Sequence, residues 1–221
     1  MAKRGQAIDI RIPMPAALRH QVEAGDKLWA HFISLFISPP VVWAIWILLV
    51  ALQFSGNPFE GTFFASLFAL TICILPMAFV AFMVKTGRIS DMHMRHSHER
   101  YIPYSIAIVG CLLTELVYLR FGANPVLVVV ALVTIVELTI MLIGTFFSHI
   151  SLHAMAMTSI ISATTIVYGF NESLIFVPVL LLVILARLTL RRHTAWQIVL
   201  GALIGTCTPL VVIAGLSLAI P

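Results

Sequence analysis

Long apolar stretches separated by short polar segments make up most of the chain. Seven stretches come near the roughly 20 residues that a helix needs to cross a bilayer. They are residues 36–55, 61–84, 102–119, 124–147, 150–169, 172–189 and 196–219. An open sheet edge cannot exist in lipid, and the ten-residue alternation typical of membrane barrels does not occur. The pattern therefore predicts an all-α fold, a polytopic membrane helix bundle with six or seven transmembrane helices.

The composition agrees with this pattern. The chain is 61% hydrophobic and only 10% charged, whereas soluble domains carry about 25% charged residues. A soluble core of this size cannot hide so much apolar surface. The formal charge of +4 then indicates membrane orientation or contact with anionic headgroups, so we expect membrane lipids as partners and no nucleic acid.

The first 35 residues are more polar and form a tail. Apolar and charged residues alternate between 14 and 32, which favours an interfacial amphipathic helix over the alternative of a plain polar tail. Residues 36–221 form the transmembrane domain. The sequence does not give the oligomeric state.

Basic residues divide unequally between the two sides of the predicted bundle. If all seven stretches cross, the tail and the segments near 85–101, 148–150 and 190–195 share one side. That side carries nearly all lysines and arginines, whereas the other has only Arg120. By the positive-inside rule we expect a multi-pass protein of the cell membrane whose N-terminus lies in the cytoplasm.

Most of the histidines fall on this same basic side. They are His93, His96, His98, His149, His153 and His193. Polar residues at membrane depth are costly and usually face a cavity. Three segments, 85–100, 148–153 and 187–193, are therefore expected to share one site on the cytoplasmic face.

Arginines beside two histidines suit phosphoryl transfer. One histidine attacks phosphorus, the other protonates the departing oxygen, and the arginines stabilise the charged oxygens. Each segment also has a plainer interpretation, as a solvated loop, a capping histidine or a snorkelling basic cluster.

The three segments resemble the motifs of the type 2 phosphatidic acid phosphatase superfamily of membrane lipid phosphatases. Its third motif is Ser-Arg, five residues, His, three residues, Asp; here Arg187 and His193 keep the spacing, while Ala186 replaces Ser and Gln197 replaces Asp. The resemblance covers about residues 85–205. The second motif, Pro-Ser-Gly-His, corresponds to 150–153, which keeps Ser151 and His153. A looser first motif, Lys-x-Gly-x-x-Ser-Asp with arginines following, is matched by Lys85, Gly87, Ser90, Asp91, Arg95 and Arg100.

The resemblance implies a transmembrane phosphatase-like domain over 36–221 that hydrolyses a phosphorylated lipid or a prenyl diphosphate. His193 would be the nucleophile and His153 the general acid. The phosphate would be held by Lys85, Arg100, Ser151 and Arg187. Asp91, Arg95 and Gln197 would support them, and neither a metal nor another cofactor would be needed.

Two other functions stay open. The losses in the motifs, Gln197 above all, fit a non-catalytic protein that binds or transports lipid phosphates. The histidine spacings at 93–98 and 149–153 fit a metal-dependent membrane lipid enzyme, because neutral imidazole binds iron and zinc well. The many arginines nearby disfavour a metal cation.

Overall fold

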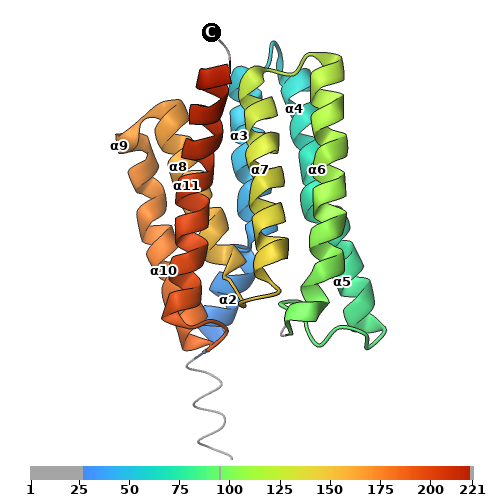
Figure 1. Ribbon diagram of the computed structural model, residues 1–221, viewed down its shortest axis with the longest axis vertical. Coiled ribbons are helices and arrows are strands. Elements are labelled where there is room, and N and C mark those ends of the chain that lie inside the picture. Colours follow the sequence, from blue (N-terminus) through green and yellow to red (C-terminus); the bar gives the residue numbers. More distant parts are fainter. Residues whose placement is uncertain (1–26, 95, 220–221) are drawn as a thin grey trace, which may run out of the picture.

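The computed structural model describes residues 27–94 and 96–219, and all regular elements in this part of the chain are helices (Figure 1). The all-α prediction is confirmed. In chain order the elements are α2 (Leu28–Phe36), α3 (Pro39–Phe54), α4 (Pro58–Phe68), the π-helix η1 (Ala69–Ile74), α5 (Leu75–Lys85), the 3-10 helix η2 (Ser97–Arg100), α6 (Tyr101–Phe121), α7 (Pro125–Gly144), α8 (Leu152–Tyr168), α9 (Phe170–Ser173), the 3-10 helix η3 (Leu174–Phe176), α10 (Val177–Thr189) and α11 (Ala195–Ala219).

Five helical segments are long and apolar enough to cross a membrane. They are Pro58–Lys85, Ser97–Phe121, Pro125–Gly144, Phe170–Thr189 and Ala195–Ser217. Helices α2 and α3, which meet at a bend of 42°, give a sixth span if they cross together. The remaining predicted segment, 150–169, is the apolar but shorter α8. The described part of the chain is therefore a polytopic helical bundle.

The helices begin where local chemistry favours a start. The side chains of Asn57 and Asn124 accept hydrogen bonds from the backbone N–H groups of Glu60 and Val126. A proline follows each asparagine at the first helical position, where no N–H is needed. Both starts lie within a few residues of those of the predicted stretches 61–84 and 124–147.

Helix α2 belongs to the bundle, although the sequence grouped its residues with the tail. It packs against α10 near the end at which α10 finishes. The part of the expected interfacial helix that falls on 14–26 lies outside the described residues. The described bundle thus includes residues from Leu28 onward.

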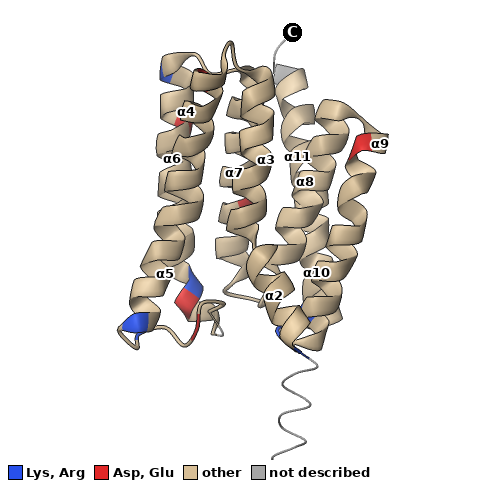
Figure 2. Ribbon diagram, turned by 180° about the vertical axis from the view of Figure 1, so that it is seen from behind, with Lys and Arg blue, Asp and Glu red and all other residues tan. Residues whose placement is uncertain are grey.

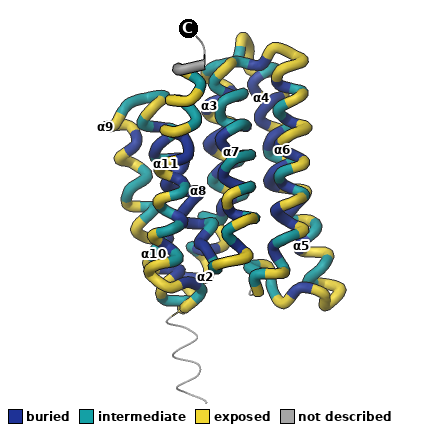
Figure 3. The backbone as a smooth tube through the Cα atoms, in the orientation of Figure 1, coloured by how far each residue is buried: buried dark blue, intermediate teal, exposed yellow. Residues whose placement is uncertain are grey.

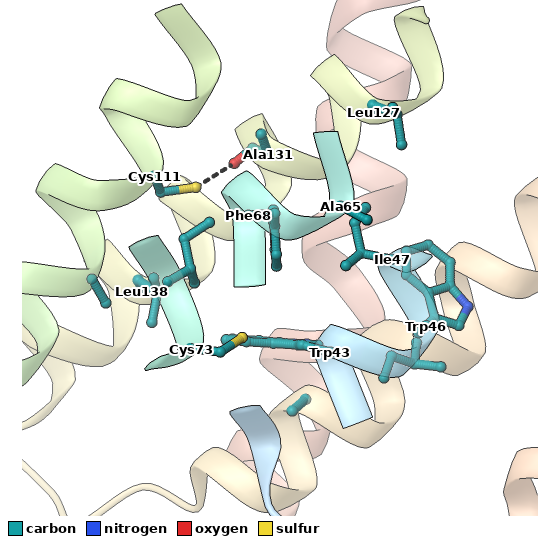
Figure 4. Packing of buried hydrophobic residues seen from close by; sticks show 14 of the residues in the cluster. Trp43, Trp46, Ile47, Ala65, Phe68, Cys73, Cys111, Leu127, Ala131 and Leu138 are labelled. Atoms are coloured by element: carbon teal, nitrogen blue, oxygen red, sulfur yellow. Dashed lines mark hydrogen bonds between the residues drawn. The ribbon is translucent and has the colours of Figure 1, made fainter. Parts of the chain in front are cut away.

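Close helix packing depends on small residues and on hydrogen bonds between helices. Gly201 and Gly205 let α11 approach α8 so nearly that an added Cβ would meet the backbone carbonyls of Ser151 and Met155. Trp46 donates to the Thr164 hydroxyl at 3.0 Å. Figure 4 shows the apolar core, in which the Cys111 thiol donates to the carbonyl of Ala131.

Buried residues line the facing sides of the helices, and exposed residues cover the outside (Figure 3). Many exposed side chains are large and apolar, such as Leu116 and Val211, as expected where lipid is the solvent. Lysine and arginine gather at the end where α2 begins and α5 and α10 finish (Figure 2). Arg120, in the last turn of α6, lies at the opposite end.

Candidate functional site

A polar cavity of about 390 Å³ opens at the basic end of the bundle. It lies where α2, the segment before η2, the α7–α8 connection and the α10–α11 turn come together. Its lining consists of Lys27, His31, Asp91, His93, Arg100, His149, Arg187, Leu190, Arg191 and Arg192. The three segments singled out in the sequence therefore contribute to one cavity, together with α2.

A second cavity, of about 420 Å³, lies among α3, α7, α8 and α11. Its walls are apolar, with Trp43, Trp46 and Phe68 among them, and no charged side chain lines it. It therefore offers no cation to an anionic group, and the candidate site is the polar cavity.

The turn between α10 and α11 brings His193 back over Arg187. The N–H of Arg192 donates to the carbonyl of Arg187, and the N–H of Arg191 donates to that of Leu188. Arg191 has a left-handed backbone (φ 50°), so the turn is a Schellman motif with arginine where glycine is usual. A non-glycine residue in this conformation costs about 1 kcal/mol or more, and such strain gathers at functional sites.

His193 is buried, and both of its ring nitrogens have partners. The Nδ1–H donates to the backbone carbonyl of His149 at 2.9 Å. Nε2 accepts a hydrogen bond from Nη2 of Arg187 at 3.2 Å. Because a carbonyl can only accept and a guanidinium can only donate, the ring is the neutral Nδ1–H tautomer with its lone pair on Nε2.

Arg187 is 3% exposed and is held from two sides. Besides the bond to His193, its Nη1 donates to the hydroxyl of Ser34 at 3.3 Å. Its Nε has no hydrogen-bond partner among residues 27–94 and 96–219. A buried N–H of this kind is normally satisfied, so Arg187 retains the capacity to bind an anion.

Arg100 and His149 form the opposite wall of the cavity. Arg100, 4% exposed, donates to the backbone carbonyls of Met94, Ile150 and His93. It also makes a short hydrogen bond to Nε2 of His149. The ring of His149 lies 5.2 Å from that of His193, centroid to centroid, so Arg100 and Arg187 flank a pair of neighbouring imidazoles.

His153, the expected general acid, lies behind this pair. It is buried, and its Nε2–H donates to the backbone carbonyl of Ser34 at 3.2 Å. Its ring stacks on His93 with centroids 6.3 Å apart. The cavity is lined by His93 and His149, whereas His153 contacts it through His93.

Asp91 connects the segment before η2 to the α10–α11 turn. One carboxylate oxygen accepts from Arg192 at 2.7 Å, and the other accepts from the N–H of His93 at 2.7 Å. Burial alone would raise the pKa of Asp91. These two hydrogen bonds and the charge of Arg192 lower it by more than burial raises it, so the pKa lies below its ordinary value. Asp91 therefore stays ionised and holds the cavity rim together.

Three histidines of the site, His193, His149 and His93, have lowered pKa values that favour the neutral ring at physiological pH. Burial, with the charges of Arg187 and Arg100, lowers the pKa of His193 to about 3. Burial and the charges of Arg100 and Arg187 lower the pKa of His149 to about 4. His93 is also lowered to about 4, by burial and by Arg187 and Arg192. An unprotonated imidazole is a nucleophile, so the electrostatics favour that role for His193.

Five of the expected site residues that the structure describes do not line the cavity: Lys85, Ser151, His153, His193 and Gln197. His193 and His153 lie behind its lining, next to Arg187 and His93. Lys85 is exposed at the C-terminal end of α5 and does not line it. The Ser151 hydroxyl caps α8 by accepting from the N–H of Ala154. The Gln197 side chain accepts from the N–H of Thr194 and, with the Thr194 hydroxyl, forms the capping box of α11. Arg95 lies outside the described residues.

Sequence reasoning missed several contributors. Ser34 was grouped with the tail, although it contacts both His153 and Arg187. His31 and Lys27 line the cavity from the same region of the chain. The acceptor for His193 is a backbone carbonyl, for which no residue type gives a signal. In the sequence, only the prolines at 39–40 indicated that the helix before them ends and the chain changes direction here.

Within the described residues, no three His, Cys, Asp or Glu side chains are arranged so that they could hold a metal ion. In comparisons with known proteins, no family model, no curated protein and no solved structure matches the chain. The helices and their apolar outer surfaces define a polytopic helical membrane protein. Its function must be argued from the cavity itself.

Proposed function

We propose that this protein is an integral membrane phosphatase for a phosphorylated lipid or a prenyl diphosphate, in keeping with its resemblance to the type 2 phosphatidic acid phosphatase superfamily. The observation that carries the proposal is the state of His193. Its Nδ1–H is held by the carbonyl of His149, and its Nε2 lone pair lies against Arg187. This is the arrangement that an imidazole nucleophile needs beside a bound phosphate.

The charge of the cavity supports an anionic substrate. Its lining includes five basic side chains, those of Lys27, Arg100, Arg187, Arg191 and Arg192, against the single carboxylate of Asp91. Two of the arginines are almost fully buried, where unbalanced charge is expensive. A phosphate group would balance this charge and would give the buried Nε of Arg187 an acceptor.

The reaction would proceed in two displacements. Oxygens of the substrate phosphate take the N–H groups of Arg187, which releases Nε2 of His193. The substrate phosphate brings one proton, which a neutral histidine takes up. Nε2 of His193 then forms a bond to phosphorus while the bond from phosphorus to the leaving oxygen breaks, and that histidine gives the proton to the leaving oxygen. Water next attacks phosphorus and the same histidine takes a proton from the water. The products are inorganic phosphate with a lipid alcohol from a phosphate monoester, or with a prenyl monophosphate from a prenyl diphosphate.

Two histidines are candidates for moving this proton. His153 is the one implied by the resemblance, and the hydrogen bond from its Nε2–H to Ser34 leaves Nδ1 for proton transfer. His149 is a second candidate, because its ring is adjacent to His193 and lines the cavity. We assign the acid role to His153, since both nitrogens of His149 are already engaged by Arg100 and the Ser97 hydroxyl.

The side of the membrane is part of the proposal. The cavity and most of the lysines and arginines lie at the same end of the bundle. The positive-inside rule puts that end in the cytoplasm of a cell-membrane protein. The substrate would then be taken from the cytoplasmic leaflet.

The test is phosphate release by purified protein in detergent. The substrates are phosphatidic acid, phosphatidylglycerol phosphate and a polyprenyl diphosphate, each with and without EDTA. Parent protein is compared with His193→Ala and with Gly215→Ala, a substitution in α11 that meets no neighbouring atom. We expect EDTA-resistant release that His193→Ala abolishes and Gly215→Ala retains, with a base-stable, acid-labile phosphoryl group on the parent.

Other outcomes would favour the alternatives. Release that EDTA abolishes and one metal restores would indicate a metal-dependent enzyme. Substrate binding without any release would indicate a lipid-phosphate binding or transport protein. Release that persists in His193→Ala would contradict the phosphohistidine mechanism.

A further inference from the structure

Ser34 lies near the C-terminal end of α2 and contacts two residues of the site through different atoms. It is 1% exposed. Its backbone carbonyl accepts the Nε2–H of His153 at 3.2 Å, and its hydroxyl accepts Nη1 of Arg187 at 3.3 Å. His153 lies on α8 and Arg187 on α10, so this one residue connects the two helices through α2.

The carbonyl of Ser34 is available because α2 ends where it does. Within the helix, the N–H of Ile37 still donates to the carbonyl of Ile33. The next N–H in the series belongs to Ser38, whose backbone is extended (ψ 151°). A residue before proline avoids the helical region, and Ser38 precedes Pro39. The proline pair thus ends α2 one residue too early for the Ser34 carbonyl to find a helical partner.

We infer that Ser34 is a positioning residue of the active site, and that α2, by docking on α10, completes the catalytic arrangement. This inference rests on the proposed phosphatase function. The carbonyl fixes the ring orientation and tautomer of His153, so that Nδ1 is the nitrogen that exchanges a proton. The hydroxyl fixes one end of the Arg187 guanidinium, so that its other N–H groups meet the phosphate.

The two contacts have separable effects. Loss of the hydroxyl should weaken phosphate binding, because Arg187 loses one of its two fixed points. Loss of the carbonyl contact should slow protonation of the leaving oxygen, because His153 loses its orientation. A purely structural role for Ser34 would instead lower the amount of folded protein. Phosphate binding and protonation of the leaving oxygen would then match those of the parent for each folded molecule.

The hydroxyl is tested by Ser34→Ala, with Ser38→Ala as the matched control. The Ser38 side chain makes no capping hydrogen bond. We expect Ser34→Ala to raise KM about tenfold, which corresponds to one hydrogen bond to a charged group, with kcat less affected. Ser38→Ala should leave both close to the parent values. Equal KM in parent and Ser34→Ala would overturn the role of the hydroxyl.

The carbonyl is tested by the double substitution Pro39→Ala with Pro40→Ala. Without proline, Ser38 can adopt helical backbone and its N–H can capture the Ser34 carbonyl. We expect kcat to fall for a lipid alcohol leaving group and to fall much less for p-nitrophenyl phosphate, whose leaving group needs no proton. The control is Pro125→Ala, at the start of α7. An equal loss with both substrates would contradict positioning of the acid.

Binding of inorganic phosphate separates this inference from the proposed function. It is followed by the rise in unfolding temperature that phosphate causes in parent, Ser34→Ala, Ser38→Ala and Arg187→Ala. If no lipid phosphate is hydrolysed, the proposed function fails, but a rise that is reduced in Ser34→Ala and lost in Arg187→Ala still supports the link from Ser34 to the anion site. A rise of equal size in parent and Ser34→Ala, or no rise in the parent, overturns it.

Discussion

His193 donates its Nδ1 hydrogen to the backbone carbonyl oxygen of His149, over 2.9 Å. In the family that the sequence resembles, a carboxylate four residues after the histidine makes this bond, and Gln197 occupies that position here. A carbonyl fixes the ring and the tautomer as a carboxylate does, but it carries no full charge. His193, the proposed nucleophile, is therefore oriented by the α7–α8 connection instead of by a residue of α11.

Replacement of Gln197 by alanine should lower stability and leave kcat close to that of the parent. Its side chain caps α11 and does not contact His193. Loss of such a cap costs about 0.5–2 kcal/mol. The measurements are the unfolding midpoint in detergent and the rate of phosphate release. Gln197→Glu, which keeps the capping box, is the control, and a loss of rate near 10⁴-fold in Gln197→Ala would instead assign it the orienting role.

The identity of the general acid can be read from leaving-group dependence. His153→Ala should slow hydrolysis of a lipid phosphate by about 10²–10⁴-fold, the usual contribution of a positioned acid. With p-nitrophenyl phosphate the loss should be much smaller, since nitrophenolate departs without a proton. His149→Ala, measured in parallel, should slow both substrates alike through disturbance of Arg100. The opposite pattern in the two variants would transfer the acid role to His149.

Stability should fall as the pH decreases from about 6.5 toward 4. The pKa of His193 is lowered to about 3 and those of His149 and His93 to about 4, whereas the unfolded chain has histidines near 6.5. Between these values the unfolded state binds more protons, so the stabilisation is complete above the unfolded pKa and is lost below it. The lowered pKa of Asp91 reduces the stability only at pH values below its ordinary pKa of 3.8.

The check is the unfolding temperature of the parent and of His193→Gln over this pH range, without added phosphate. The variant lacks one of the groups that take up a proton on unfolding, so its curve should be shallower. Curves of equal slope would show that His193 is already charged in the folded protein.

The helices could be predicted from the sequence because their signals are local. Apolar length, together with asparagine and proline at 57–58 and 124–125, fixes where they begin. The gathering of Arg100, Arg187 and His193 could also be predicted, since alternate connections of a membrane bundle share one side. Lys85 shares that side but lies at the end of α5, and the sequence gives no lateral distance across the membrane face.

The hydrogen-bond partners of the histidines could not be predicted. Both acceptors are backbone carbonyls without a helical N–H donor. Ser34 lies where α2 ends, and His149 lies in the connection between α7 and α8. Every residue carries such a carbonyl, so its availability depends on the tertiary structure. For Ser34 it depends on a helix that the sequence assigned to the tail.

Gly205→Ala should destabilise the bundle by about 1–3 kcal/mol, the usual cost of overpacking. An added Cβ would meet the Met155 carbonyl and the Thr158 hydroxyl, so α8 and α11 would have to separate. Gly215→Ala, in the same helix but with no atom nearby, should be neutral or slightly stabilising. The measurement is thermal unfolding in detergent, and equal midpoints for the two variants would contradict the close approach of these helices.

Helix α8 has 17 residues and is about 25 Å long, which is less than the roughly 30 Å of a bilayer's hydrocarbon layer. Its first turn carries His153, which stacks on His93 of the cavity lining, while Phe146 and Phe147 just before it are exposed. Placing its far end at the opposite interface would put this first turn a few ångströms beneath the headgroups. We therefore expect a water-filled cavity that reaches below the headgroups. A phosphorylated lipid could then bring its headgroup to the histidines while its apolar chains stay in the leaflet.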